Sequence, residues 1–174
     1  GIADAQRAMR VIRSHAPQLA IDPARVGVIG FSAGGFLTSS LQTRHAHAFY
    51  RPVDALDSLS ARPFLAAPIY PVQSLDPAIA YKDAARVLFN GKLGPQEIAA
   101  YSPDRNVAAD SAPGFFVHAA DDYGVPIANS SRLAGALREK GVTAELHEFA
   151  TGGHGFGFLR DPAKPVAIWP ELFI

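Results

Sequence analysis

The sequence has no cysteine among its 174 residues, so it can form neither a disulfide nor a thiolate metal site. It also has no excess charge, because 16 basic and 16 acidic side chains give a formal net charge of +0. Proteins that bind nucleic acid or an anionic membrane surface usually need a basic face, so this balance argues against both partners. No apolar run reaches the roughly 20 residues needed to span a bilayer.

What the chain does contain is typical of one globular domain. Apolar residues make up 48% of it, which is enough for a core, and the length fits a single domain over residues 1–174. The 15 glycines and 14 prolines predict many turns and irregular connections. No internal repeat or low-complexity tract divides the chain further.

Hydrophobic periodicity predicts helices that alternate with strands. Apolar residues recur at helical spacing from Ala5 to Ala16, and Pro17 is expected to close this first helix. The remaining predicted elements are strand 26–29, helix 33–47, strand 62–70, a mixed segment 71–112 with a short helix near 81–89, strand 114–120, helix 126–141, strand 142–149 and a terminal segment around Trp169. This order predicts an α/β fold, with a mostly parallel sheet and helices on both faces.

Chemically active residues follow three of these strands. Ser32 follows strand 26–29, Asp121 and Asp122 follow strand 114–120, and His154 follows strand 142–149. The carboxyl ends of parallel strands meet at one edge of the sheet, where sites in open α/β sheets are found. The order Ser, Asp, His is the one expected of an α/β-hydrolase.

Each residue type has a reason to be there. Serine becomes a useful nucleophile only when a base such as His154 takes its proton, and an acid such as Asp122 fixes the imidazole tautomer. The stretch "GFSAGG" predicts a sharp strand-to-helix turn, in which Gly30 and Gly34 avoid a clash that a Cβ would cause. The turn would aim the Ala33 N–H, at a helix N-terminus, toward a developing oxyanion.

Taken singly, these residues have ordinary explanations. A lone G-x-S-x-G is a weak signal, and an acid in a turn usually caps or faces water. Four other histidines, His15, His45, His47 and His147, belong to no motif, and "HAH" at 45–47 is interpreted as a solvated helix end rather than a metal site. Ser39, Ser40, Ser130 and Ser131 are interpreted as ordinary helix or cap serines. The predicted chemistry requires no metal and no organic cofactor.

Several stretches resemble the acetylxylan-esterase-like branch of bacterial α/β-hydrolases, which includes esterases, lipases and dienelactone-hydrolase-like proteins. They are "IDPARVGVIGFSAGG", "PIYPV", "HAADDYGVPIANSSRLAGALREKGVTAELHEFATGGHGFG" and "PVAIWPELF", and together they cover nearly the whole chain. The resemblance implies a secreted or periplasmic carboxylic ester hydrolase that acts on small acyl esters. Acetylated plant polysaccharide, or another carbohydrate or small-molecule ester, is the implied substrate.

The resemblance also distinguishes the two aspartates. The family pattern H-x-x-x-D-x-x-V-P is filled here by His118, Asp122, Val125 and Pro126, which implies that Asp122 is the triad acid. Asp121 is then expected to hydrogen-bond within its loop, and His118 to be structural. The predicted catalytic set is therefore Ser32, Asp122 and His154, with Ala33 in the oxyanion hole.

One departure from the family pattern is the missing H-G-G loop, which would precede Ser32 and supply a second oxyanion N–H. The sequence is therefore expected to be the C-terminal part of the fold, without its N-terminal strands. Such a sheet would expose a hydrophobic edge, which predicts either a homo-oligomer or association with the missing N-terminal half. The mixed segment 71–112, with Tyr123 and Phe156, is expected to wall the substrate pocket.

Two alternative functions stay open at this point. A prolyl-oligopeptidase-like serine peptidase has the same Ser, Asp, His order, although an aromatic residue usually follows its serine and Ala33 stands here. The other alternative is a catalytically impaired α/β fragment that serves as a binding or assembly module. Labelling of the chain by a fluorophosphonate would distinguish an active serine hydrolase from the inert fragment.

Overall fold

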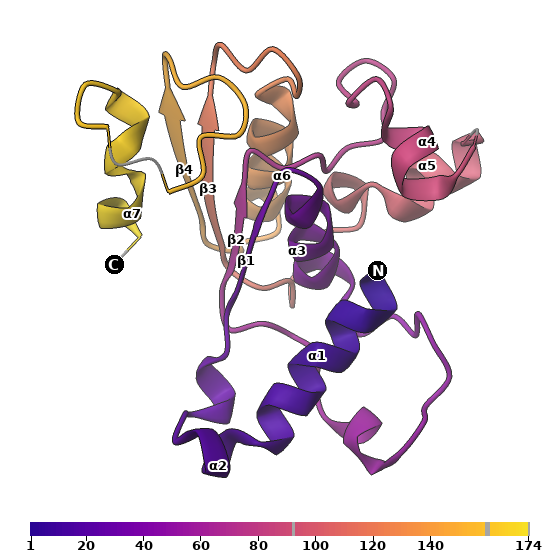
Figure 1. The fold of residues 1–174 in the computed structure, drawn as a ribbon. Helices are drawn as coiled ribbons and strands as arrows, with labels where there is room; N and C mark the ends of the chain where they lie inside the picture. The colour runs from indigo at the N-terminus through magenta and orange to yellow at the C-terminus, as the bar shows by residue number, and fades with distance from the viewer. Residues whose placement is uncertain (92, 159–160, 174) are drawn as a thin grey trace.

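Four parallel strands form one sheet, in the order β1-β2-β3-β4 (Figure 1). The computed structural model describes residues 1–91, 93–158 and 161–173. The strands are β1 (Val28–Phe31), β2 (Ala66–Ile69), β3 (Gly114–Ala119) and β4 (Ala144–Phe149). Because every pairing is parallel, the carboxyl ends of all four strands lie along the same edge of the sheet. The predicted parallel α/β sheet is confirmed.

Helices cover both faces of this sheet, as predicted (Figure 1). The helices are α1 (Ile2–Ser14), α2 (Ala16–Leu19), α3 (Ala33–Arg44), α4 (Ala84–Phe89), α5 (Pro95–Tyr101), α6 (Ala128–Glu139) and α7 (Trp169–Leu172). Single 3₁₀ turns occupy Pro23–Arg25, Ala55–Ser58, Pro103–Arg105 and Pro165–Ile168. Helices α3 and α6 lie on one face, and α7 lies on the other.

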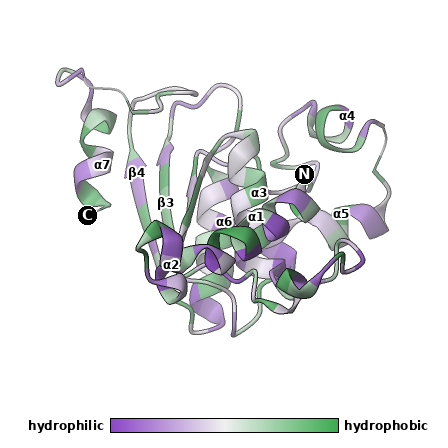
Figure 2. Cartoon of the chain, turned by 60° about the horizontal axis from the view of Figure 1, so that its bottom comes forward, coloured by the Kyte–Doolittle hydropathy of each residue, from purple (hydrophilic) through white to green (hydrophobic). Residues whose placement is uncertain are grey.

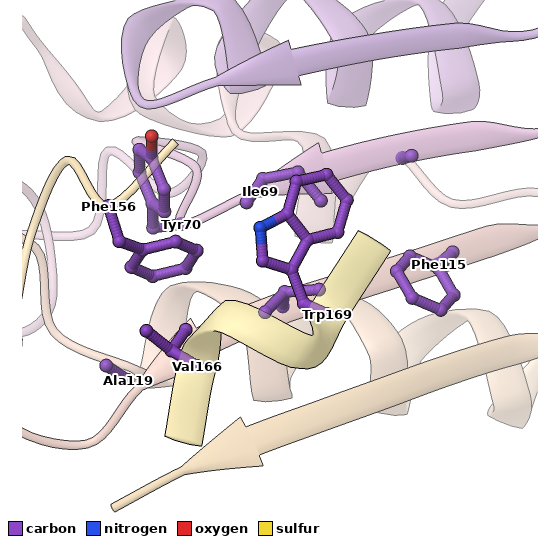
Figure 3. Close-up of a cluster of buried hydrophobic side chains, with 9 residues drawn as sticks. Ile69, Tyr70, Phe115, Ala119, Phe156, Val166 and Trp169 are labelled. Atoms are coloured by element: carbon purple, nitrogen blue, oxygen red, sulfur yellow. The ribbon is translucent and has the colours of Figure 1, made fainter. Parts of the chain in front are cut away.

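The alternation of side chains along β3 builds the core on both faces. Phe116 points to the α6 side and packs with Leu133 and Leu137. Its neighbours Phe115 and Val117 point the other way, into a cluster that includes Trp169 (Figure 3). All six residues of β3 are buried, as expected for an apolar strand that is covered on both faces.

Two helices show contrasting patterns that follow from their places in the fold. Helix α3 is buried along most of its length, which agrees with its lack of charge before Arg44. Helix α1 lies outside α3 and is amphipathic, with hydrophilic and hydrophobic residues along it (Figure 2). Met9 of α1 contacts the cluster that contains Leu41 of α3. The buried helix α3 is the one that begins next to Ser32.

One predicted boundary was wrong, and one helix was not predicted. Pro17 does not close the first helix, because α1 ends at Ser14 and Pro17 lies in the first turn of α2. Proline is tolerated there because a first-turn N–H has no acceptor within the helix. Segment 71–112 also contains a second helix, α5, that was not predicted. Its start signals are a proline in the first turn and Glu97, whose carboxylate accepts the Gly94 N–H at 3.0 Å.

The outer edge of β1 pairs with no strand in the described part of the chain. Ile29 of β1 is 41% exposed, so this edge carries accessible apolar surface. The open edge was expected, but the oligomer or partner inferred from it stays a prediction. No helix among residues 1–91, 93–158 and 161–173 is long and apolar enough to cross a membrane.

Candidate active site

Ser32 lies between β1 and α3 in a backbone conformation that is rare for a residue with a side chain. Its φ is 51° and its ψ is −114°, which places it in the strained region usually taken by glycine. Contacts with the end of β2 hold it there. The Ser32 N–H donates to the Ile69 carbonyl at 3.1 Å, and the Ser32 carbonyl accepts the Val72 N–H at 3.1 Å.

Two glycines make this turn sterically possible, and they are Gly30 and Gly35. A Cβ on Gly30 would lie 2.3 Å from the Gly34 carbonyl oxygen, and one on Gly35 would lie 2.7 Å from Pro71. A Cβ on Gly34 would have no neighbour within 4 Å. The steric reason predicted for Gly34 was therefore wrong, and it applies to Gly35 instead.

The turn brings Ser32 against His154, and His154 against Asp122. Ser32 Oγ lies 2.8 Å from His154 Nε2, and His154 Nδ1 lies 2.7 Å from Asp122 Oδ2. The Asp122 carboxylate is buried, whereas 20% of the His154 side chain is exposed. The structure thus places the three residues predicted for catalysis in one hydrogen-bonded chain.

The Asp122 carboxylate is held ionised by the donors around it. Burial opposes the charge, but the backbone N–H of Val125, the His154 imidazole and the backbone N–H of Gly124 together lower the pKa of Asp122. Both amides donate to Oδ1 at 2.8 Å. Oδ1 is therefore fixed by the backbone, and Oδ2 is the oxygen that faces His154.

Glycines and Asp121 shape the loop that carries His154. Gly153 and Gly155 flank the histidine with φ of 65° and 82°, a conformation that favours glycine. Asp121 Oδ1 accepts the N–H groups of Gly152 and Gly153 at 2.9 and 2.8 Å. Asp121 is a loop hydrogen-bonding residue, as predicted, but its partners lie in the loop after β4 and not in its own loop.

Tyr70 supports the same loop from the end of β2. Its ring lies edge-on to the His154 imidazole, with centroids 5.0 Å apart, and its hydroxyl oxygen accepts the Gly157 N–H at 3.1 Å. The Trp169 indole donates to the Gly157 carbonyl at 2.8 Å. Phe156 packs on Tyr70 (Figure 3) and is buried, so it supports this cluster and does not wall the cavity as predicted.

Ala33 is the first residue of α3, so its N–H has no acceptor within the helix. A helix N-terminus also carries a partial positive charge, which favours a nearby anion. Ala33 and Ser32 both line one cavity, and the oxyanion role of the Ala33 N–H stays a prediction.

This cavity has a volume of about 370 Å³ and opens beside Ser32. Its lining consists of Ser32, Ala33, Val72, Tyr81, Ala84, Val87, Leu88, Tyr123, Gly124, Val125 and His154. One wall comes from segment 71–112, as predicted, and is mainly apolar. Tyr123, which follows Asp122 and is 88% exposed, also lines the cavity. The cavity can hold a small, largely apolar group against the serine.

Two buried residues, His118 and Ser130, extend the hydrogen bonding of the triad. His118 is fully buried, and its Nε2 lies 3.2 Å from Asp122 Oδ2, while Ser130 Oγ lies 2.8 Å from its Nδ1. Ser130 is therefore more than the ordinary helix serine that the sequence predicts, and the sequence did not predict the contact of Tyr70 with His154. Both tyrosine and histidine stand at the carboxyl ends of strands, and that signal could have pointed to them.

The "HAH" segment is not a solvated helix end throughout. His45 is buried, and its Nε2 lies 3.5 Å from Asp110 Oδ2. Burial lowers the pKa of His45. Among the described residues, no group of three or more histidine, aspartate or glutamate side chains is arranged to hold a metal ion.

A protein-family model, BD-FAE, matches residues 1–137. The chain belongs to the BD-FAE family. The match includes Ser32 and Asp122, while His154 lies beyond it. Together with the solved structures below, it confirms the resemblance to acetylxylan-esterase-like α/β-hydrolases and the α/β-hydrolase fold.

Similar proteins of known name include esterases. An acetylxylan esterase of Xylanibacter ruminicola is 32% identical over 162 residues, which is 90% of this chain and 31% of that protein. A crystal structure of an acetyl ester-xyloside bifunctional hydrolase from Caldicellulosiruptor lactoaceticus is 36% identical, with a TM-score of 0.91, and the match covers 99% of this chain and 62% of that one.

A thermophilic esterase from Thermogutta terrifontis is 26% identical, with a TM-score of 0.78, over 99% of this chain and 60% of that one. Another structure of the T. terrifontis esterase 2 is phosphonylated by sarin. The chain thus spans about three fifths of these solved structures and 31% of the curated relative.

Proposed function

We propose that this BD-FAE chain is a serine carboxylic ester hydrolase that works through a Ser32-His154-Asp122 triad. The observation that carries the proposal is the continuous hydrogen-bonded path from Ser32 Oγ through both imidazole nitrogens to Asp122 Oδ2, with links of 2.8 and 2.7 Å. Two similar proteins, an acetylxylan esterase and an acetyl ester-xyloside bifunctional hydrolase, support the same reaction class.

The first half of the reaction is acyl transfer to Ser32. Its Oγ attacks the ester carbonyl carbon while His154 Nε2 takes the hydroxyl proton, and the carbonyl oxygen becomes an oxyanion beside the Ala33 N–H. Asp122, which is ionised, stabilises the imidazolium that forms. Collapse of the tetrahedral intermediate breaks the bond to the alcohol, which takes the proton from His154 and leaves an acyl-serine.

The second half repeats the same steps with water. His154 Nε2 removes a proton from a water molecule, whose oxygen attacks the acyl carbon. The intermediate then releases Ser32 Oγ, which recovers its proton from His154, and the carboxylic acid departs. Two half-reactions use one base, so the geometry around His154 governs both.

The substrate proposed is a short-chain acyl ester, such as an acetyl group on xylan or another carbohydrate. The cavity of about 370 Å³ beside Ser32 has room for a small acyl group. Among the described residues, the part of segment 71–112 that lines the cavity carries no charged side chain, so it offers no charged partner to a longer polar acyl group. The named relatives, an acetylxylan esterase and an acetyl ester-xyloside hydrolase, support acetyl as the acyl group.

Hydrolysis of p-nitrophenyl acetate tests the proposal. The expected result is turnover by the chain, and loss of about 10⁶-fold in kcat for Ser32→Ala, by comparison with another serine hydrolase whose nucleophile was removed. Ser131→Ala is the matched control, because Ser131 lies exposed on α6 and is predicted to leave the rate unchanged. Equal rates for wild type and Ser32→Ala would contradict the proposal.

A further inference from the structure

His118, at the end of β3, touches the triad without being part of it. Its side chain is fully buried, and Nε2 faces two oxygens, Asp122 Oδ2 at 3.2 Å and the Val125 carbonyl at 3.0 Å. On the other side, Nδ1 lies 2.8 Å from Ser130 Oγ. Every polar atom of this imidazole therefore has a partner within hydrogen-bond distance.

These partners fix the protonation of the ring. A backbone carbonyl and an ionised carboxylate can only accept hydrogen bonds. Nε2, which faces one of each, must therefore carry the proton. Nδ1 then accepts, and the Ser130 hydroxyl donates to it. Burial lowers the pKa of His118, which keeps the ring neutral. The side chain is a neutral donor whose direction is set at both ends.

The Nε2–H of His118 therefore points at Asp122 Oδ2, the oxygen that faces His154. Asp122 Oδ1 is held by two backbone amides, while Oδ2 receives both the His154 Nδ1–H and the His118 Nε2–H. Two donors from different directions leave Oδ2 little freedom to rotate away. Catalytic geometry is sensitive to such freedom, since a displacement of about 1 Å can cost a factor of about 10².

We propose that His118 is a positioning residue that fixes Oδ2 of Asp122 against His154 by donating a second hydrogen bond to the same oxygen. The proposal rests on the triad function proposed above, because only then does the direction of Oδ2 affect a rate. Ser130 acts with His118, since its hydroxyl selects the tautomer that can donate.

The pH profile of kcat/KM reports this contact. Removing the His118 donor leaves more negative charge on Oδ2, and this charge favours the protonated imidazole beside it. The acid limb of the profile is then expected to move to higher pH. The titratable groups around His154 and His118 in the described structure are Tyr70, Asp121, Asp122, Tyr123 and the two histidines themselves.

The experiment compares His118→Phe with His118→Gln. Phenylalanine fills the space without a donor, whereas the glutamine amide can place an N–H near the position of Nε2. For His118→Phe we expect kcat to fall about tenfold with KM little changed, and the acid limb to move up by about half a pH unit. For His118→Gln we expect the acid limb of the pH profile at the same pH as in wild type, and a kcat within about threefold of the wild-type value.

Ser130→Ala gives an independent test if His118→Phe does not fold. It should move the acid limb in the same direction by less, while Ser131→Ala, one residue further along α6, should not move it. A second readout is the proton NMR signal of the His154 Nδ1–H, which needs no turnover. This signal should shift in His118→Phe and Ser130→Ala and persist unchanged in His118→Gln and Ser131→Ala.

The outcomes separate the two proposals. If folded His118→Phe, or Ser130→Ala in its place, keeps the wild-type limb and the wild-type proton signal, the positioning role is overturned. If the wild-type chain neither hydrolyses p-nitrophenyl acetate nor reacts with a fluorophosphonate, the hydrolase function is contradicted. The proton signal then still decides whether His118 orients Asp122.

Discussion

Ser32 and Tyr70 both hold backbone angles that residues with side chains seldom adopt, with φ of 51° and 37°. They follow the neighbouring strands β1 and β2, so the strain lies at one edge of the sheet. Such strain persists only where the surroundings enforce it. Around Ser32 the surroundings are the end of β2 and the two tightly packed glycines Gly30 and Gly35.

The glycine contacts predict a difference between two adjacent positions. Gly35→Ala should lower the free energy of unfolding by about 1–3 kcal/mol, because its Cβ would meet the rigid Pro71 ring. Gly34→Ala should change that free energy by less than about 1 kcal/mol, since its Cβ has open space. Urea unfolding of both variants checks this, and equal losses would contradict the steric assignment.

Tyr70→Phe isolates one hydrogen bond behind His154. The variant keeps the ring against the imidazole but loses the hydroxyl oxygen that accepts the Gly157 N–H. We expect kcat/KM for p-nitrophenyl acetate to fall about fivefold, the rate equivalent of about 1 kcal/mol. Wild-type kcat/KM in this variant would mean that the hydroxyl does not help to hold the loop.

The sequence predicts which residues lie at the same edge of the sheet better than it predicts which side chains touch one another. Ser32, Asp122 and His154 could be placed together because each follows a strand, and parallel strands end at one edge. The contacts of Tyr70 and His118 depend on how side chains pack, which a single sequence does not encode in any spacing. The choice between Gly34 and Gly35 likewise depends on where Pro71 lies.

The loop after β4 is the element that sets the position of His154. Positive φ angles at Gly153 and Gly155 give it a tight path, and Asp121 ties its start to the end of β3. These contacts link the two strand ends that carry the acid and the base. The loop is therefore held at its start by Asp121 and at its end by the cluster that contains Phe156 and Trp169.

Asp121→Ala tests this tie. Two glycine N–H groups would lose their acceptor, and His154 would gain freedom to move away from Ser32. We expect kcat to fall ten- to hundredfold, as for a displacement of about 1 Å, with a small change in Tm because these bonds are exposed to water. Asp121→Asn, which keeps an oxygen acceptor, is the control. Equal kcat in both variants and in wild type would mean that the hydrogen bonds of Asp121 to the loop do not help to position His154.

All four strands and the main helices could be predicted from hydrophobic runs and periodicity, with boundaries shifted by a few residues. The misjudged parts have physical reasons. A proline can follow the end of one helix or lie in the first turn of the next, as Pro17 does, so the residue type alone does not decide. Helix α5 spans only Pro95–Tyr101, which is too short for periodicity to stand out from the surrounding turns.

Over the whole molecule, buried titratable groups predict weaker stability in acid. Burial lowers the pKa of both His118 and His45 below the ordinary value of 6.5, so the unfolded chain binds protons that the folded chain does not. Stability should therefore fall as pH drops below about 6.5 and toward the lowered folded values. Asp122, with its lowered pKa, adds a further loss below pH 3.8.

Urea unfolding at a series of pH values checks this expectation. His118→Gln should show a smaller loss between pH 6.5 and the lower values than wild type, because one of the two buried imidazoles is gone. His45 should account for part of the loss of stability that remains in this variant. A free energy of unfolding that rises as pH falls from 6.5 would contradict the direction assigned to both groups.

The central claim is that Ser32 is the nucleophile of a triad, and covalent capture tests it most directly. The measurement is mass spectrometry of the chain after reaction with a fluorophosphonate, with the adduct mapped by peptide fragmentation. One adduct, on the peptide that contains Ser32, is predicted for wild type, and none for Ser32→Ala. An unlabelled wild-type chain, or equal labelling of wild type and Ser32→Ala, would contradict the claim.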